Sequence, residues 1–247
     1  LGGATPDGEP DLRLAGRPGT DKRFGRSVAG VGDVNADGFA DLLIGAPGSG
    51  ATWWGGDTPG WAFLYLGRSS LSDVPDFTWT GGDPPTALGS VVAGGGDLNA
   101  DGFADLLVTE PGPTGSSGES IALHVVLGAV TPAEELVFEL DGQTDATHCP
   151  RHVANTGDVN GDGFADFVVW LPNSSGGDTA LLYFGGPVID RTADLEFLGT
   201  SGVRKFGYSV AGAGDINGDG YADVLVGAAD LGGTGNTRTF TLPTGAA

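Results

Sequence analysis

The sequence predicts an all-β protein made of four similar units. Glycine accounts for 47 of the 247 residues, follows no three-residue period and separates short apolar runs, as turns between strands require. The stretch GDVNADGFADLLIGAP recurs with small changes in four places, and each copy leads from a polar loop into an apolar run of strand length. A chain of this length can bury a large core, so we expect residues 1–247 to form one domain.

The four units follow one another at similar distances. Their first aspartates, Asp33, Asp97, Asp158 and Asp215, lie 64, 61 and 57 residues apart. The 32 residues before Asp33 and the 33 residues from Asp215 to the end together amount to one further unit. We therefore expect the fourth unit to be divided between the two ends of the chain.

Each unit contains four strand-like runs between turn residues. In the first unit these are RSVAGVGD (26–33), ADLLIGAP (40–47), WAFLYLG (61–67) and DFTWTG (76–81). The initial DLRLAG (11–16) matches the fourth run, and TRTFTLP (237–243) matches the third. Pairing of these two ends would close a ring and cover exposed strand edges. The simplest result is a β-propeller of four four-stranded blades, closed by the N-terminal strand on the C-terminal blade.

The acidic stretches follow the pattern D-x-N-x-D-G-x-x-D, over residues 33–41, 97–105, 158–166 and 215–223. Oxygen ligands at alternate positions of a tight loop suit calcium, which takes six to eight oxygens. Positions 1, 3, 5 and 9 would supply side chains, position 7 its carbonyl, and the glycine at position 6 the sharp bend. The four predicted calcium sites are Asp33, Asn35, Asp37, Phe39 and Asp41; Asp97, Asn99, Asp101, Phe103 and Asp105; Asp158, Asn160, Asp162, Phe164 and Asp166; and Asp215, Asn217, Asp219, Tyr221 and Asp223.

An EF-hand is the competing interpretation of these loops, and it needs a glutamate at position 12. Position 12 is instead Ile44, Val108, Val169 or Val226, so each loop opens into a strand rather than a helix. Unneutralised carboxylates would repel one another beside a buried strand. We therefore expect a structural rather than a regulatory role for calcium.

These residues resemble the FG-GAP repeats of the integrin α-subunit propeller and of related bacterial proteins. The FG position is Phe24-Gly25, Leu88-Gly89, Cys149-Pro150 and Phe206-Gly207, and the GAP position is Gly45-Ala46-Pro47, Thr109-Glu110-Pro111, Trp170-Leu171-Pro172 and Gly227-Ala228-Ala229. The resemblance implies a calcium-binding propeller that recognises its ligand on the face opposite the calcium loops. Integrin-type propellers have seven blades, whereas this chain has sequence for four. The divided fourth unit favours a monomeric ring of four, but part of a larger ring and an eight-bladed ring of two chains stay open.

Two groups of residues are candidates for that ligand face. Trp53 and Trp54 lie in the longest connection, residues 47–60, and could stack on a sugar or anchor a protein, or could fold back over the blade. Two basic pairs, Lys22 with Arg23 and Arg204 with Lys205, occupy equivalent connections. In a closed ring they would form a basic spot for an acidic ligand, and ordinary solvated charge near the end of a turn is the simpler interpretation.

Composition excludes several other classes of protein. A net charge of −21 argues against nucleic acid and anionic membranes as partners, and no apolar run approaches the length of a membrane span. Cys149 is the only cysteine, and it aligns with Phe24, so it is expected to fill a core position rather than to act with His148 and His152 in catalysis or zinc binding. We expect a chain without catalytic residues.

The sequence therefore favours a non-enzymatic recognition or adhesion module with a protein or glycan ligand. A lectin-like domain and the accessory propeller of a secreted hydrolase are the alternatives. The chain has no methionine and no signal-peptide pattern, so we expect a processed piece of a longer extracellular or cell-surface product.

Overall fold

A computed structural model describes residues 12–17, 19, 21–48, 58–70, 72–83, 85–112, 121–132, 135–140, 152–171, 178–199, 206–228 and 240–241. These residues form strands and turns, which confirms the all-β prediction. None of the described segments is a helix long and apolar enough to cross a membrane. The four strands of the first sheet coincide with the four runs predicted for the first unit.

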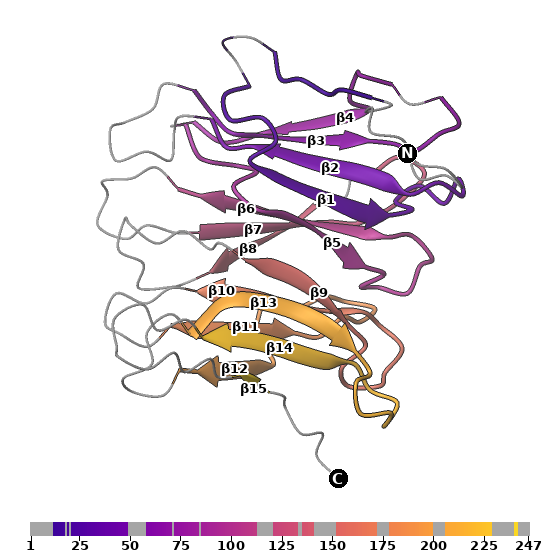
Figure 1. Cartoon of the computed structure of the whole chain (residues 1–247), viewed down its shortest axis with the longest axis vertical. Helices are drawn as coiled ribbons and strands as arrows, with labels where there is room; N and C mark the ends of the chain where they lie inside the picture. The colour runs from indigo at the N-terminus through magenta and orange to yellow at the C-terminus, as the bar shows by residue number, and fades with distance from the viewer. Residues whose placement is uncertain are drawn as a thin grey trace.

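The described strands form four antiparallel sheets, in each of which every strand pairs with its neighbour in sequence (Figure 1). The first sheet contains β1 (Ser27–Gly32), β2 (Asp41–Ala46), β3 (Trp61–Tyr65) and β4 (Phe77–Thr80). The second contains β5 (Val92–Gly96), β6 (Asp105–Pro111), β7 (Ile121–Val126) and β8 (Glu135–Leu140). The third contains β9 (Val153–Gly157), β10 (Asp166–Leu171), β11 (Thr179–Tyr183) and β12 (Leu195–Leu198). The fourth contains β13 (Phe206–Gly214), β14 (Asp223–Ala228) and β15 (Phe240–Thr241).

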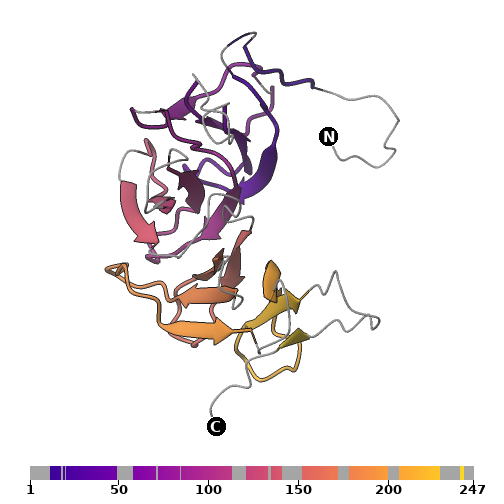
Figure 2. The same cartoon turned by 90° about the vertical axis from the view of Figure 1, so that its left-hand side faces the viewer.

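The four sheets follow one another along an arc, with the first and the fourth at its two ends (Figure 2). The first strands of consecutive sheets, β1, β5, β9 and β13, lie side by side. Up-and-down antiparallel sheets that face one another in this way are consistent with the blades of a β-propeller.

The second strand of each of the first three sheets is buried on both faces, which explains its unbroken apolar sequence. Successive side chains of a strand point to opposite faces, so in β6 Leu106 packs against the first sheet and Leu107 against the third. The third and fourth sheets are joined by Trp170, whose indole N–H donates to the carbonyl of Phe206 at 2.8 Å. Hydrophobic clusters between sheets therefore hold the fold together.

The predicted closure of the ring is not found in the described part of the chain. There the fourth sheet has only β13, β14 and β15, and residues 12–17 form no strand. Leu14 and Phe24 pack instead on the outer side of the first sheet, against a cluster that includes Ile44 and Phe63. That side has no sheet before it, so the nearest apolar side chains of the same chain cover it. The number of blades in a closed ring stays a prediction.

Replacing Leu123 by alanine tests whether the inter-sheet clusters carry the stability. Leu123 is fully buried between the second and third sheets, so Leu123→Ala should lower the free energy of unfolding by about 2–5 kcal/mol. Leu198, on the outer strand β12, is 65% exposed, and Leu198→Ala should change it by less than about 0.5 kcal/mol. Urea unfolding of both variants provides the measurement, and similar losses would contradict the packing argument.

Candidate functional site

The four acidic loops begin with the same backbone conformation. Each follows a glycine with a positive φ between 65° and 82°, a region that glycine enters without steric cost. The pairing of the first two strands of each sheet shifts by one residue near this point. The four glycines are Gly32, Gly96, Gly157 and Gly214. The shift turns the chain out of the sheet, so the loops stand at one end of the strands, on the right in Figure 1.

Within each loop, the side chains at positions 1, 3 and 5 accept hydrogen bonds from the backbone. In the first loop, the two carboxylate oxygens of Asp33 accept from Asp37 N at 3.1 Å and Gly38 N at 2.8 Å. Asn35 Oδ1 also accepts from Asp37 N, and Asp37 Oδ1 accepts from Phe39 N at 2.9 Å. The same bonds occur in the other three loops. The predicted ligand residues at these positions are thus held in one turn.

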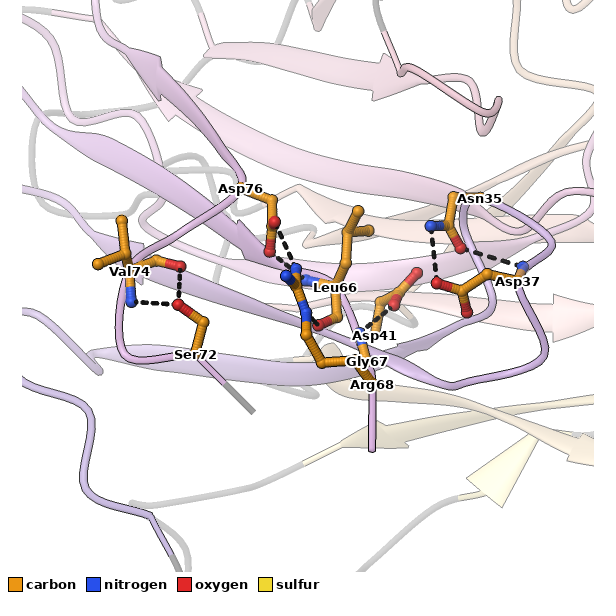
Figure 3. Close-up of polar contacts among 9 residues, drawn as sticks. All are labelled: Asn35, Asp37, Asp41, Leu66, Gly67, Arg68, Ser72, Val74 and Asp76. Carbon is orange, nitrogen blue, oxygen red and sulfur yellow. Dashed lines mark hydrogen bonds and ion pairs between the residues drawn. The ribbon is translucent and has the colours of Figure 1, made fainter. Parts of the chain in front are cut away.

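The amide at position 3 also contacts the carboxylate at position 5. Asn35 Nδ2 donates to Asp37 Oδ2 at 2.9 Å (Figure 3), and the other loops repeat this contact at 2.8–2.9 Å. Backbone N–H groups stabilise the loop charge as well, because hydrogen bonding, chiefly by Gly220 N–H, lowers the pKa of Asp215. Each loop therefore already surrounds its carboxylates with donors.

The donor set of these loops fits a hard divalent cation. Positions 1, 3 and 5 present two carboxylates and one amide oxygen in an exposed turn, and oxygen-only sets suit calcium. A cation would take over the role of the amide N–H as partner of the position-5 carboxylate. Within the described ranges, no three His, Cys, Asp or Glu side chains are grouped so as to hold a metal, so the four calcium sites stay a prediction.

The ninth-position aspartate is placed differently from the other loop aspartates. Asp41 is buried, and its Oδ2 accepts from Val34 N at 2.7 Å. Its Oδ1 accepts from Gly67 N, also at 2.7 Å (Figure 3). Asp105 and Asp166 make the equivalent pairs of bonds. This carboxylate joins the acidic loop to the connection between the third and fourth strands of the same sheet. The sequence predicted this aspartate only as a metal ligand. The pattern gave no indication that it also holds two parts of the sheet together.

Burial changes the acidity of these ninth-position carboxylates. Loss of solvent raises the pKa of Asp41, and it raises those of Asp105 and Asp166 to about 6. Hydrogen bonds from backbone N–H groups act in the opposite direction, and the neighbouring loop aspartates raise the pKa further. The backbone N–H donors are thus the groups that stabilise the ionised form of these buried carboxylates.

The loops are also bonded to one another across the sheets. The backbone N–H at position 8 of one loop donates to the position-1 carbonyl of the loop before it, at 2.8–3.0 Å. The three bonds run from Ala104 to Asp33, from Ala165 to Asp97, and from Ala222 to Asp158. Each of the first three loops is therefore hydrogen-bonded directly to the loop of the next sheet.

The basic residues predicted to bind a ligand lie at the other end of the first sheet. Lys22 and Arg23 are exposed, and the carbonyl of Lys22 accepts from Gly48 N, just beyond the end of β2 that is distant from the acidic loop. The adjacent Asp21 is buried and paired with Arg17 at 3.0 Å, which fixes this turn. Trp53, Trp54, Arg204, Lys205, His148 and Cys149 lie outside the described residues.

Sequence reasoning missed a buried polar cluster in the second sheet. Glu110 contacts His124 Nε2 at 2.5 Å and accepts from the Thr86 hydroxyl and from Gly82 N. Burial opposes ionisation of Glu110, but these bonds outweigh it and lower its pKa to about 2. The cluster ties the connection before β5 to β6 and β7. One sequence signal could have indicated this cluster: Glu110 is a charged residue at the GAP position that Ala46 occupies in the first unit.

Comparison with known proteins accounts for the repeated loops. A family model described as FG-GAP repeat matches residues 24–60, 88–123 and 206–240. Integrin alpha-5 of Xenopus laevis is 32% identical over 180 residues, and integrin alpha-E of Mus musculus is 41% identical over 100 residues. This chain is an integrin alpha-like FG-GAP domain. The family resemblance expected from the FG, GAP and loop residues is thereby confirmed.

The FG-GAP domain corresponds to a small part of these relatives. The alignments cover 70% of the chain and 17% of integrin alpha-5, and 38% of the chain and 9% of integrin alpha-E. Integrin alpha-PS2 of Drosophila melanogaster is 27% identical over 225 residues, which are 84% of the chain and 15% of that relative. The chain thus spans less than a fifth of the length of the integrins it matches.

The raised pKa of Asp105 predicts a specific dependence of stability on pH in metal-free protein. Its pKa is about 6 in the folded domain against an ordinary value of 3.8, so between these values the folded state binds a proton that the unfolded state lacks. This aspartate should therefore make the free energy of unfolding rise as the pH falls from 7 to 5. Urea titrations in a chelator should show a shallower rise for Asp105→Asn than for the wild type.

Asp101→Asn, in the exposed part of the same loop, is the control for this experiment, and it should keep most of the wild-type rise. If Asp105→Asn and the wild type gave the same pH dependence, Asp105 would not be the titrating group.

Proposed function

We propose that this domain is a calcium-stabilised, non-catalytic propeller that serves as an extracellular recognition or adhesion module. Its supporting observation is the set of four acidic loops with one backbone design, of which consecutive loops are bonded across the sheets. Similarity to integrin alpha chains adds support for a recognition role. The proposed place of action is outside the cell or at its surface, where calcium is abundant.

Calcium is proposed at all four loops. The side chains at positions 1, 3 and 5 and the carbonyl at position 7 would hold it, with the ninth-position aspartate completing or supporting the site. When bound, the ion supplies positive charge to carboxylates that otherwise repel one another. Because each loop contacts the next sheet through its position-1 carbonyl, ordering the loops should stabilise the stacking of the sheets.

The proposed ligand face is the one opposite the loops. Lys22 and Arg23 are exposed there on a chain with a net charge of −21, so they offer an isolated positive area to a carboxylate of a protein ligand. Arg204 and Lys205, together with Trp53 and Trp54, complete the predicted set. Nucleic acid and membrane lipid are not among the proposed partners.

Removal of calcium should lower the thermal stability of the domain. A ligand present at about 100 times its Kd stabilises the folded state by about 2.7 kcal/mol per site, so several occupied loops should raise the melting temperature markedly. Differential scanning calorimetry with excess calcium and then with a chelator gives the comparison. An unchanged melting temperature would remove the structural role of calcium.

Calorimetric titration of the chelated protein should show four calcium sites, and Asp101→Ala should leave three. Arg191→Glu, which changes an exposed residue outside the four loops, should keep all four and so serves as the control.

Reversal of the basic pair should abolish ligand binding without affecting the fold. The double variant Lys22→Glu and Arg23→Glu is expected to lose most binding to immobilised acidic proteins, because it replaces attraction by repulsion. Arg191→Glu, an exposed charge reversal on the side of the calcium loops, should bind like the wild type. Surface plasmon resonance in calcium measures both.

Binding that is retained by the basic-pair variant but lost by Trp53→Ala with Trp54→Ala on a glycan array would support the lectin-like alternative instead. Binding to neither class of ligand would contradict the recognition function while leaving the calcium proposal intact.

A further inference from the structure

The four acidic loops share most of their hydrogen bonds but differ at position 4, the residue after the asparagine. Position 4 is alanine in the first two loops and glycine in the last two, at Ala36, Ala100, Gly161 and Gly218. All four residues have a positive φ, of 56° for the alanines and 78° for the glycines. Glycine has no Cβ, so the peptide nitrogen that follows Asn160 or Asn217 is unshielded. No other asparagine of the sequence is followed by glycine.

We propose that Asn160 and Asn217 are modification sites, at which the loop converts its own asparagine to aspartate or isoaspartate. The reactants are the side-chain amide of the asparagine, the backbone nitrogen of the following glycine, and water. Neither an enzyme nor a metal takes part, so the proposal goes beyond the function proposed above and does not depend on it. In the first two loops, the Cβ of the alanine hinders the same attack.

The asparagine side chain is folded back over the peptide that attacks it. Asn160 Oδ1 accepts from Asp162 N at 3.0 Å, and Asn217 Oδ1 accepts from Asp219 N at 2.8 Å. A side-chain carbonyl that reaches the N–H two residues ahead brings its carbon, Cγ, close to the peptide nitrogen in between. Asn35 is folded in the same way (Figure 3). The loops therefore differ in the attacking nitrogen and not in the asparagine.

A proton acceptor lies beside the attacking nitrogen in the last two loops. Gly161 N donates to Asp158 Oδ1 at 2.6 Å, and Gly218 N donates to Asp215 Oδ1 at the same distance. In the first two loops, the position-1 carboxylate accepts from the backbone of positions 5 and 6 and not from position 4. A carboxylate within hydrogen-bond reach can take up the proton of a nitrogen that forms a new bond. The loops with the unshielded nitrogen are thus also the loops with a local base.

The reaction has two steps. The nitrogen of Gly161 bonds to Cγ of Asn160 while the bond between Cγ and Nδ2 breaks. Nδ2 leaves as ammonia, and the proton lost from Gly161 N reaches it by way of the Asp158 carboxylate and solvent. The product is a five-membered succinimide ring. Water then opens this ring at one of its two carbonyl carbons, which gives aspartate or isoaspartate at position 160.

Either product changes the loop. The amide of Asn160 donates to Asp162 Oδ2 at 2.8 Å, and a carboxylate in its place turns this attraction into a repulsion. Isoaspartate also adds one atom to the main chain between Asp158 and Asp162, so the bonds of the turn lose their register. Conversion at both sites makes the net charge two units more negative than the −21 of the unmodified sequence.

The two sites lie on the two sides of one sheet contact. Ala222 in the fourth loop donates its N–H to the carbonyl of Asp158 in the third loop at 2.8 Å. The contact between the first and second loops, from Ala104 to Asp33, lies between two loops that have alanine at position 4. The modification therefore affects the contact between the third and fourth sheets and spares the one between the first and second.

The test is an incubation of the purified full chain in mildly alkaline buffer. Samples are digested with pepsin in acid, and mass spectrometry of the peptides reports conversion, since a carboxylate is heavier than an amide. The peptides with Asn160 and Asn217 should gain mass severalfold faster than those with Asn35 and Asn99. The Asp-Gly pairs at positions 5 and 6 of every loop can also isomerise, but their mass does not change, so they do not disturb the measurement.

Exchange of the position-4 residues provides matched variants. In Gly218→Ala the new Cβ would meet nothing within 4 Å, and Ala36 already adopts a positive φ at the same position. Conversion at Asn217 should fall severalfold, while Asn160 in the same molecule keeps its rate and serves as the internal reference. The reverse change, Ala100→Gly, should raise conversion at Asn99 severalfold. Circular dichroism checks that both variants are folded.

Equal conversion in all four loops, or none at Asn160 and Asn217, would overturn the proposal. It would equally be overturned if Gly218→Ala left the rate at Asn217 unchanged, or if Ala100→Gly left Asn99 as slow as in the wild type.

Discussion

The need to cover both faces of every sheet is the constraint on which this structure depends. Residues of β6 alternate between the cluster shared with the first sheet and the cluster shared with the third, so no sheet can bury its apolar side chains alone. Stacking along an arc covers both faces of the second and third sheets with a neighbouring sheet. In the first and fourth sheets, the apolar positions Val28 and Ile216 are exposed.

The acidic loops divide their carboxylates between two tasks. The side chains of Asp33 and Asp37 stay at the surface and accept bonds from their own loop, whereas Asp41 is buried and also accepts from Gly67 in a distant connection. Backbone donors hold both groups, and the exposed pair faces the solvent. A chain can place a charge directly before a buried strand because the buried Asp41 carboxylate accepts hydrogen bonds from two backbone N–H groups, one of them from a distant connection.

The sequence was sufficient to predict the strands and the loops, because both depend on local patterns. Alternating oxygens, a glycine with positive φ and an unbroken apolar run recur in each unit and need no knowledge of neighbours. The similarity of residues 11–16 to an outer strand was also visible, and Gly16 occupies the position of Gly199 in the structure. The similarity of a segment to an outer strand, however, does not identify the sheet with which it pairs. A local sequence pattern therefore could not establish whether the ring closes within the chain.

Long-range polar contacts were missed for the same reason. Gly67 lies 26 residues from Asp41, and Thr86 lies 24 from Glu110, so neither spacing carries a recognisable motif. The acidic loops have both kinds of contact, since their internal bonds are local while the carbonyl of Asp33 bonds to Ala104 in the next sheet. On our proposal, a bound cation orders the local turn and thereby the donor geometry of the sheet contact. Metal binding and sheet stacking would then be one equilibrium, which leaves the opposite end of the strands free to vary for recognition.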